Sequence, residues 1–195
     1  MQTNFWKQLC TPEYFTDTDG NACYLKGKKS LNDCEKYLII PSYSPENHPK
    51  GYESTITANA AMDISAARDG LRMNIEVEKI LKFEGYEDRI SEIQNFEKLL
   101  PDYKFDDSGA LCEWSMKGYE ENNVHRHISH LYCAWPAYET QHSKVLTDAC
   151  NQAIENRNTE NKGHDDTASH GWVHKALVAA RLKNSKSVYE TLYIL

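Results

Sequence analysis

Residues 57–81 read TANAAMDISAARDGLRMNIEVEKIL, and their apolar residues recur at helical spacing. Successive members of the stripe lie three or four residues apart, as the core-facing side of a helix requires. The stripe consists of Ala60, Ile64, Ala67, Leu71 and Ile75, and is continued at slightly shifted phase by Val77, Ile80 and Leu81. The stretch therefore predicts an amphipathic helix with one face in the core.

Similar patterns predict further helices on both sides of this stretch. They are expected at 4–9, at about 87–100 where Pro101 stops the run, at 143–156, at 172–182 and from about 185 onward. Period-2 alternation, which marks a half-buried strand, is sustained nowhere beyond four or five residues. The sequence therefore predicts an all-α fold with long functional loops.

Charge and cysteine usage limit the classes of partner. The net charge is −7, whereas nucleic-acid binding depends on clustered Lys and Arg over phosphates, so no nucleic-acid partner is expected. No stretch approaches the run of about 20 apolar residues that a membrane helix needs, so no membrane partner is expected either. The six cysteines form no CxxC pair, and free thiols are expected. Cys23 and Cys34 could close a small loop in an oxidising compartment.

The stretch HRHISHLY at 125–132 concentrates three imidazoles and one guanidinium. Three interpretations fit it: a zinc or copper site with Cys133 nearby, a site for a sugar, or a solvated polar loop. The neighbouring residues include Glu113 and Trp114, and the segment 131–138 is aromatic. Aromatic faces stack on pyranose rings, and carboxylates and Arg bond the hydroxyls, so the surroundings favour a sugar.

These residues also carry a resemblance to a known family. HRHISHLY, with CEW at 112–114 before it, resembles the signature of glycoside hydrolase family 95, the inverting α-L-fucosidases and their relatives. PSYSPEN at 41–47 resembles the family's PSxSPEN loop, and AAMD at 60–63, GW at 171–172 and AARL at 179–182 agree in order. HRHxSHLY and SPEN together are specific. The similarity covers most of the chain from about residue 37.

The resemblance implies a fold and an activity. The fold is an α/α toroid, or six-hairpin barrel, and residues 1–195 supply about half of the helices that such a ring needs. The helical spacing of residues 188–195 also stops without a cap. We therefore expect residues 1–195 to be a partial catalytic domain, truncated at both ends. The implied reaction is inverting hydrolysis of terminal α-L-fucosides, or related α-L-galactosides, in oligosaccharides.

The resemblance also implies roles for individual residues. Glu46, the Glu of SPEN, is the expected general acid, and Tyr43 and Tyr52 predict a partly dry pocket that favours its protonated form. Arg126 and His127 match the family's sugar-contacting pair. Four further residues have expected places around the site: Glu113 and Trp114 shape the substrate pocket, and His125 and His130 stand behind it. Trp172 fits the core as well as a stacking platform. No cofactor and no metal ion is implied.

The general base is expected outside this chain. In the family it is an Asp in a DGN loop downstream of the ARL helix, and the single DGN here, at 19–21, precedes SPEN. Asp165 and Asp166 are weak substitutes in a polar loop. Where the family continues GLYPG after HLY, this chain has CAWPA at 133–137, which leaves fucose and an L-galactose-type sugar both open. Two other classes also stay open, a non-catalytic helical carbohydrate-binding module and a His-loop metal-binding protein.

Overall fold

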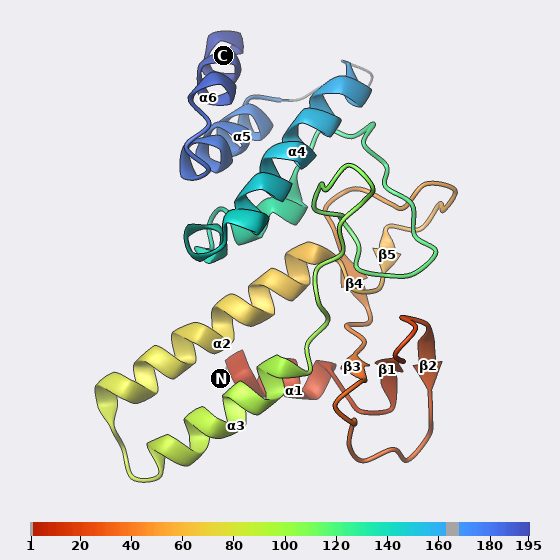
Figure 1. Cartoon of the computed structure of the whole chain (residues 1–195), viewed down its shortest axis with the longest axis vertical. Coiled ribbons are helices and arrows are strands. Elements are labelled where there is room, and N and C mark those ends of the chain that lie inside the picture. The colour runs from red at the N-terminus through yellow and green to blue at the C-terminus, as the bar shows by residue number, and fades with distance from the viewer. Residues whose placement is uncertain (1, 163–167) are drawn as a thin grey trace.

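Helix α2, Ala61–Leu81, lies at the centre of the structure (Figure 1). The structure is a computed structural model and describes residues 2–162 and 168–195. Helix α2 packs against α1 (Gln2–Leu9), α3 (Tyr86–Lys98), the 3-10 turn η1 (Ser129–Cys133) and strand β4 (Ser42–Tyr43). The predicted stripe is confirmed from Ala60 to Ile75, whose members are all buried. Its expected continuation through Val77, Ile80 and Leu81 was wrong, because these three side chains are exposed.

Helices α2 and α3 form an antiparallel hairpin (Figure 1). Lys82 and Gly85 adopt left-handed backbone conformations, which end α2 and reverse the chain before α3. Helix α3 ends at Lys98, two residues before the predicted boundary, and Pro101 follows it. The facing sides of the hairpin, together with α1, enclose a first core of Cys10, Ile39, Ile64, Ala67, Leu71, Ile75, Ile93, Phe96 and Leu100.

The second half of the chain is also helical. It contains η2 (Glu139–His142), α4 (Lys144–Asn161), α5 (Ser169–Arg181) and α6 (Ser185–Ile194). The Ser143 side chain caps α4 by accepting a hydrogen bond from the N–H of Leu146, and α4 runs five residues beyond its predicted end. A second core, which includes Leu131, Cys150, Ile154 and Val178, lies between these helices and η1. Tyr103 packs against both cores and so joins the two halves.

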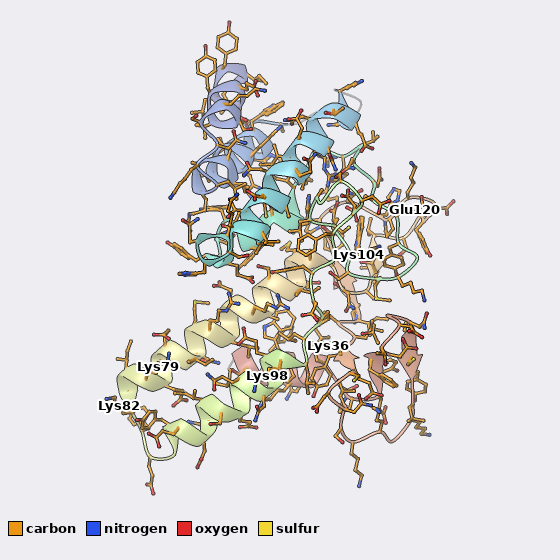
Figure 2. All side chains as sticks on the ribbon, viewed as in Figure 1. Lys36, Lys79, Lys82, Lys98, Lys104 and Glu120 are labelled. Carbon is orange, nitrogen blue, oxygen red and sulfur yellow. The ribbon has the colours of Figure 1, made fainter. Side chains whose placement is uncertain are left out.

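Two small sheets correct the all-α prediction. The first has the order β2-β1-β3, from β1 (Tyr14–Thr16), β2 (Ala22–Tyr24) and β3 (Lys36–Tyr37), with all pairs antiparallel. The second pairs β4 with β5 (Ile56–Thr57). Strands of two or three residues are too short to show alternation, so the sequence pattern missed them. The Lys36 ammonium donates to the carbonyl of Lys98 at 2.8 Å, which fastens β3 to the end of α3 (Figure 2).

The thiols behave as the sequence predicts. All six cysteines are free, including Cys23 and Cys34. Within the described ranges, no helix combines the length and the apolar character needed to cross a bilayer.

Candidate active site

The loop that carries Glu46 follows β4 directly and is fixed to the start of α2. The Asp63 carboxylate, in the first turn of α2, accepts hydrogen bonds from the Ser42 hydroxyl at 2.6 Å and from the N–H of Tyr43 at 3.0 Å. The Ser42 oxygen in turn accepts the N–H of Ala60 at 2.8 Å. The sequence therefore places Glu46 just beyond a rigid junction of strand and helix, where its side chain is 58% exposed.

Glu46 contacts the histidine-rich segment, residues 125–132, in which Arg126 lies 80 residues further along the chain. Nη2 of Arg126 donates to Oε2 of Glu46, and Nε2 of His127 lies 3.9 Å from the same oxygen. The Ser129 hydroxyl donates to the carbonyl of Pro45 at 3.0 Å, so a hydrogen bond from side chain to backbone also joins the two loops. Arg126 and His127 therefore converge on the carboxyl group of Glu46, the third residue that the sequence assigned to the same site.

The expected dry pocket around Glu46 is not formed by the described residues. Tyr43 and Tyr52 are both exposed, and Tyr52 turns to pack edge-on against Tyr119, with ring centroids 5.1 Å apart. The prediction was wrong because nearness in sequence does not fix which way a loop aromatic points. Glu46 stays accessible to water and to a ligand.

Glu113 and Trp114 lie behind the Glu46 loop, and both are fully buried. The Glu113 carboxylate accepts hydrogen bonds from the Ser44 hydroxyl at 2.6 Å and from the side-chain amide of Asn47 at 2.7 Å. The Trp114 indole N–H donates to the Thr57 hydroxyl at 3.1 Å. The sequence predicts that both residues shape the sugar pocket, and the structure buries both behind the Glu46 loop.

An ion pair compensates the buried charge of Glu113. Burial alone would raise the pKa of the Glu113 carboxyl, but the Arg157 guanidinium, at 2.8 Å, and the hydrogen bond from Ser44 outweigh it and lower that pKa. Glu121 lies beside this pair and accepts the backbone N–H of Glu113 at 2.8 Å. Burial raises the pKa of Glu121 to about 7, because the N–H of Glu113 and the cations Arg157 and Lys104 offset the burial only in part.

The histidines around this site differ in burial. His125 and His130 are buried, His127 is half-buried and His170 is exposed. His130 is fully enclosed, and burial lowers its pKa to about 3, so its imidazole is neutral near pH 7. His125 is buried beside His127, with ring centroids 5.3 Å apart, and His127 also meets His170 of α5 at 5.4 Å. Burial likewise lowers the pKa of His174, one turn further along α5. In the described ranges, no group of three or more His, Cys, Asp or Glu is arranged to hold a metal ion.

Arg126 also lines a cavity of about 230 Å³. Trp172 is half-buried in its wall, with the Lys175 ammonium 5.2 Å from its ring centroid, so this indole is not part of the buried core. The wall is rich in nitrogen donors and is made by His125, Arg126, Ile128, Arg157, Asn158, Asn161, Lys162, Trp172 and Lys175. Such a wall suits a polar ligand with oxygen acceptors.

Sequence reasoning missed several residues that build this site. The PSYSPEN motif predicts no role for Ser44 and Asn47, and Arg157 lies beyond the predicted end of its helix. Arg157 continues the buried α4 face that contains Leu146, Cys150 and Ile154, and this spacing was the available signal. Asp165 and Asp166, the substitute bases, lie outside the described residues.

Comparison with known proteins identifies the family of the chain. The chain is 27% identical to alpha-L-fucosidase 2 of Arabidopsis thaliana over 203 aligned positions, which include 93% of the chain. The chain spans 23% of that relative's length, less than a quarter. Residues 22–195 match the glycosyl hydrolase family 95 catalytic domain, a region that includes the Glu46 loop, the histidine-rich segment and all helices from α2 to α6. The chain belongs to glycosyl hydrolase family 95.

Proposed function

We propose that this chain carries the general-acid half of an inverting α-L-fucosidase site. Glu46 protonates the leaving oxygen, and Arg126 and His127 bind hydroxyls of the sugar. The convergence of Arg126 and His127 on one oxygen of Glu46 carries the proposal, because it brings acid and sugar-binding donors within one sugar's width. Membership of the family and the fucosidase relative support the same reading.

The chemistry fits the residue types. An inverting glycosidase uses one carboxylic acid to protonate the leaving group and one carboxylate to activate water, about 6.5–9.5 Å away. A guanidinium has five N–H donors in a planar fork, so Arg126 can bridge Glu46 and a sugar hydroxyl. Bonds of this kind that tighten as the ring distorts lower the barrier as well as aid binding.

In this proposal the general base lies outside residues 1–195, and the overall fold is the one that the family implies. The family's base follows the ARL helix, and no Asp follows Leu182 in this chain. We propose that helices α2 to α6 form part of an α/α toroid whose remaining helices, and whose base loop, come from elsewhere. Glu113 and Trp114 support the pocket from behind in this proposal.

The decisive experiment replaces the acid and varies the leaving group. In a protein that contains this chain and the base loop, Glu46→Gln should lower kcat on a fucosylated oligosaccharide by about 10²–10⁴-fold. Loss on a nitrophenyl α-L-fucoside should be much smaller, because nitrophenolate leaves without protonation. Glu53→Gln, the same change at an exposed position between β4 and β5, is the matched control and should alter neither rate.

Equal losses on the two substrates would contradict the assignment of Glu46 as the general acid.

A binding measurement on residues 1–195 complements this test. L-fucose and L-galactose should each perturb the NMR signals of His127, and Arg126→Met should abolish the perturbation by the better ligand. Binding that survives with no turnover in the larger protein would favour the carbohydrate-binding module instead.

A further inference from the structure

The carboxylate of Glu113 is joined to both flanks of Glu46. Ser44 lies two residues before Glu46 and donates to Oε1 of Glu113 at 2.6 Å. Asn47, one residue after Glu46, donates to Oε2 at 2.7 Å. Hydrogen bonds to a charged acceptor are short and directional, so two of them, one on each oxygen, restrict the loop on both sides of the exposed side chain.

A second set of contacts holds the Glu113 carboxylate itself in place. Arg157 of α4 donates to Oε2 of Glu113 at 2.8 Å and to the carbonyl of Asn122 at 3.1 Å. Asn122 and Asn47 exchange two hydrogen bonds, at 3.0 and 3.2 Å. Glu121 accepts the N–H of Glu113 at 2.8 Å. The buried Glu113 carboxylate therefore ties the loop around Glu46 to helix α4, and the two bonds between Asn47 and Asn122 tie the same loop to the segment beside Glu121.

We propose that Glu113 is a positioning residue, which sets where Glu46 stands relative to Arg126 and His127. The proposal rests on the general-acid role of Glu46 proposed above. Through Ser44 and Asn47, Glu113 fixes the loop, while Ser129 fixes the histidine-rich segment to Pro45. The acid and the sugar-binding donors then share one rigid frame, as a site needs when misplacement by about 1 Å can cost 10²-fold in rate.

A second buried carboxylate offers a contrast. Glu139 accepts hydrogen bonds from the Ser65 hydroxyl at 3.0 Å and from the Tyr103 hydroxyl at 2.8 Å, and Arg68 lies 3.9 Å away. These partners belong to α2 and to the junction of the two cores. The Ser65–Glu139 contact is thus a hydroxyl-to-carboxylate hydrogen bond like Ser44–Glu113, among partners that do not include the Glu46 loop.

The first test uses this pair of serines. In a protein with the base loop, Ser44→Ala should lower kcat on the oligosaccharide about tenfold, with KM little changed and a smaller loss on the nitrophenyl fucoside. Ser65→Ala removes an equally buried bond to a Glu and should leave the ratio of the two rates unchanged. Equal losses on both substrates in Ser44→Ala would overturn the positioning role, because a general loss of folded protein lowers both rates alike.

The second test does not depend on turnover. In residues 1–195 the N–H of Asn47 bonds the carbonyl of Ser44 at 2.8 Å, and the N–H of His48 bonds the Asn47 side chain at 2.9 Å. Amide hydrogen exchange at these two positions should accelerate at least tenfold in Glu113→Gln and in Ser44→Ala, with α2 and α3 unchanged. If Glu113→Gln does not fold, Ser44→Ala decides alone.

The two tests separate the two proposals. Unchanged exchange at Asn47 and His48 in a folded variant would show that Glu113 does not hold the loop. Accelerated exchange, combined with a Glu46→Gln variant that loses activity equally on both substrates, would keep the positioning of the loop and remove the acid role of Glu46.

Discussion

Three buried ionisable side chains near the Glu46 loop hold different charge states. Glu113 is charged because Arg157 and several hydrogen bonds compensate its burial. His130 is neutral because burial disfavours the imidazolium, and its Nδ1 has no hydrogen-bond partner in the described part of the chain. Glu121 titrates near neutrality because nearby positive charges offset only part of the rise in pKa that burial causes. The surroundings of each group, and not its residue type, set its charge.

The Glu113–Arg157 pair gives the first stability prediction. Arg157→Met leaves a fully buried carboxylate without its cation and should lower the free energy of unfolding by about 3–5 kcal/mol. The control is Lys144→Met, which removes an exposed pair with Asp148 on the same helix and should cost less than about 1 kcal/mol. Urea unfolding at pH 7 measures both. Similar costs for the two variants would mean that the buried pair is not needed.

His130 should make stability depend on pH. Its pKa is about 3 in the folded state and about 6.5 in the unfolded state, so between these values the unfolded chain binds more protons. Its contribution is complete above pH 6.5 and is lost as the pH falls toward 3. Between pH 7 and pH 5 the loss is up to about 2 kcal/mol. His130→Leu removes the titrating imidazole. The free energy of unfolding, measured with urea, should therefore fall less between pH 7 and pH 5 in the variant than in the parent. An equal fall in the free energy of unfolding in the two proteins would contradict this prediction.

Glu121 should act in the opposite direction. Its pKa is raised to about 7, so the folded state holds a proton that the unfolded chain has lost above its ordinary pKa near 4.5. Its contribution is therefore complete below about pH 4.5 and disappears as the pH rises through 7. Glu121→Gln keeps an acceptor for the N–H of Glu113 without the charge, and should raise the free energy of unfolding at pH 8 more than at pH 5. Thermal unfolding at both pH values tests this, and a larger gain at pH 5 would refute it.

Among the elements, α2 links the core to the candidate site. Its buried face fills the first core, and Asp63 in its first turn fixes the strand that leads to Glu46. The same helix packs against η1, which continues from the histidine-rich segment. Helix α2 therefore contacts both the strand before Glu46 and the turn that follows Arg126 and His127.

A cavity in the buried face of α2 should be costly. Leu71 is fully enclosed, and Leu71→Ala should lower the free energy of unfolding by about 2–5 kcal/mol. Ile80 lies on the same helix with 77% of its surface exposed, and Ile80→Ala should change stability by about 0.5 kcal/mol or less. Chemical unfolding of both variants provides the measurement, and equal effects would show that α2 is not packed as described.

On the scale of the whole molecule, helix α6 presents a large apolar surface. Tyr189, Leu192 and Tyr193 are exposed, Tyr193 to 80%, and they line a groove of about 630 Å³ between α5 and α6. Exposed apolar patches of this kind favour association. Residues 1–195 should therefore self-associate in size-exclusion chromatography at tens of micromolar, and Leu192→Lys should reduce this. A monomeric elution of the parent at that concentration would contradict the expectation.

The sequence alone determined the helices and the candidate chemistry. The stripe from Ala60 to Ile75, the stop at Pro101 and the apolar spacing of residues 146–153 depend on near neighbours in the chain, so each could be predicted within a few residues. The motifs around Glu46 and Arg126 identified the family for the same reason, since each is a short run of adjacent residues.

Tertiary structure decided which of these residues are buried and which lie at the surface. Glu113 was expected at the pocket but meets Ser44, 69 residues away, and Arg157, 44 residues away, in the interior. The exposure of Tyr43, the strands of two or three residues and the role of Arg157 also depend on partners remote in sequence. Periodicity in a segment depends only on residues that are close together in the chain. The burial of a polar side chain depends on donors brought together by folding, and no single stretch of sequence contains them.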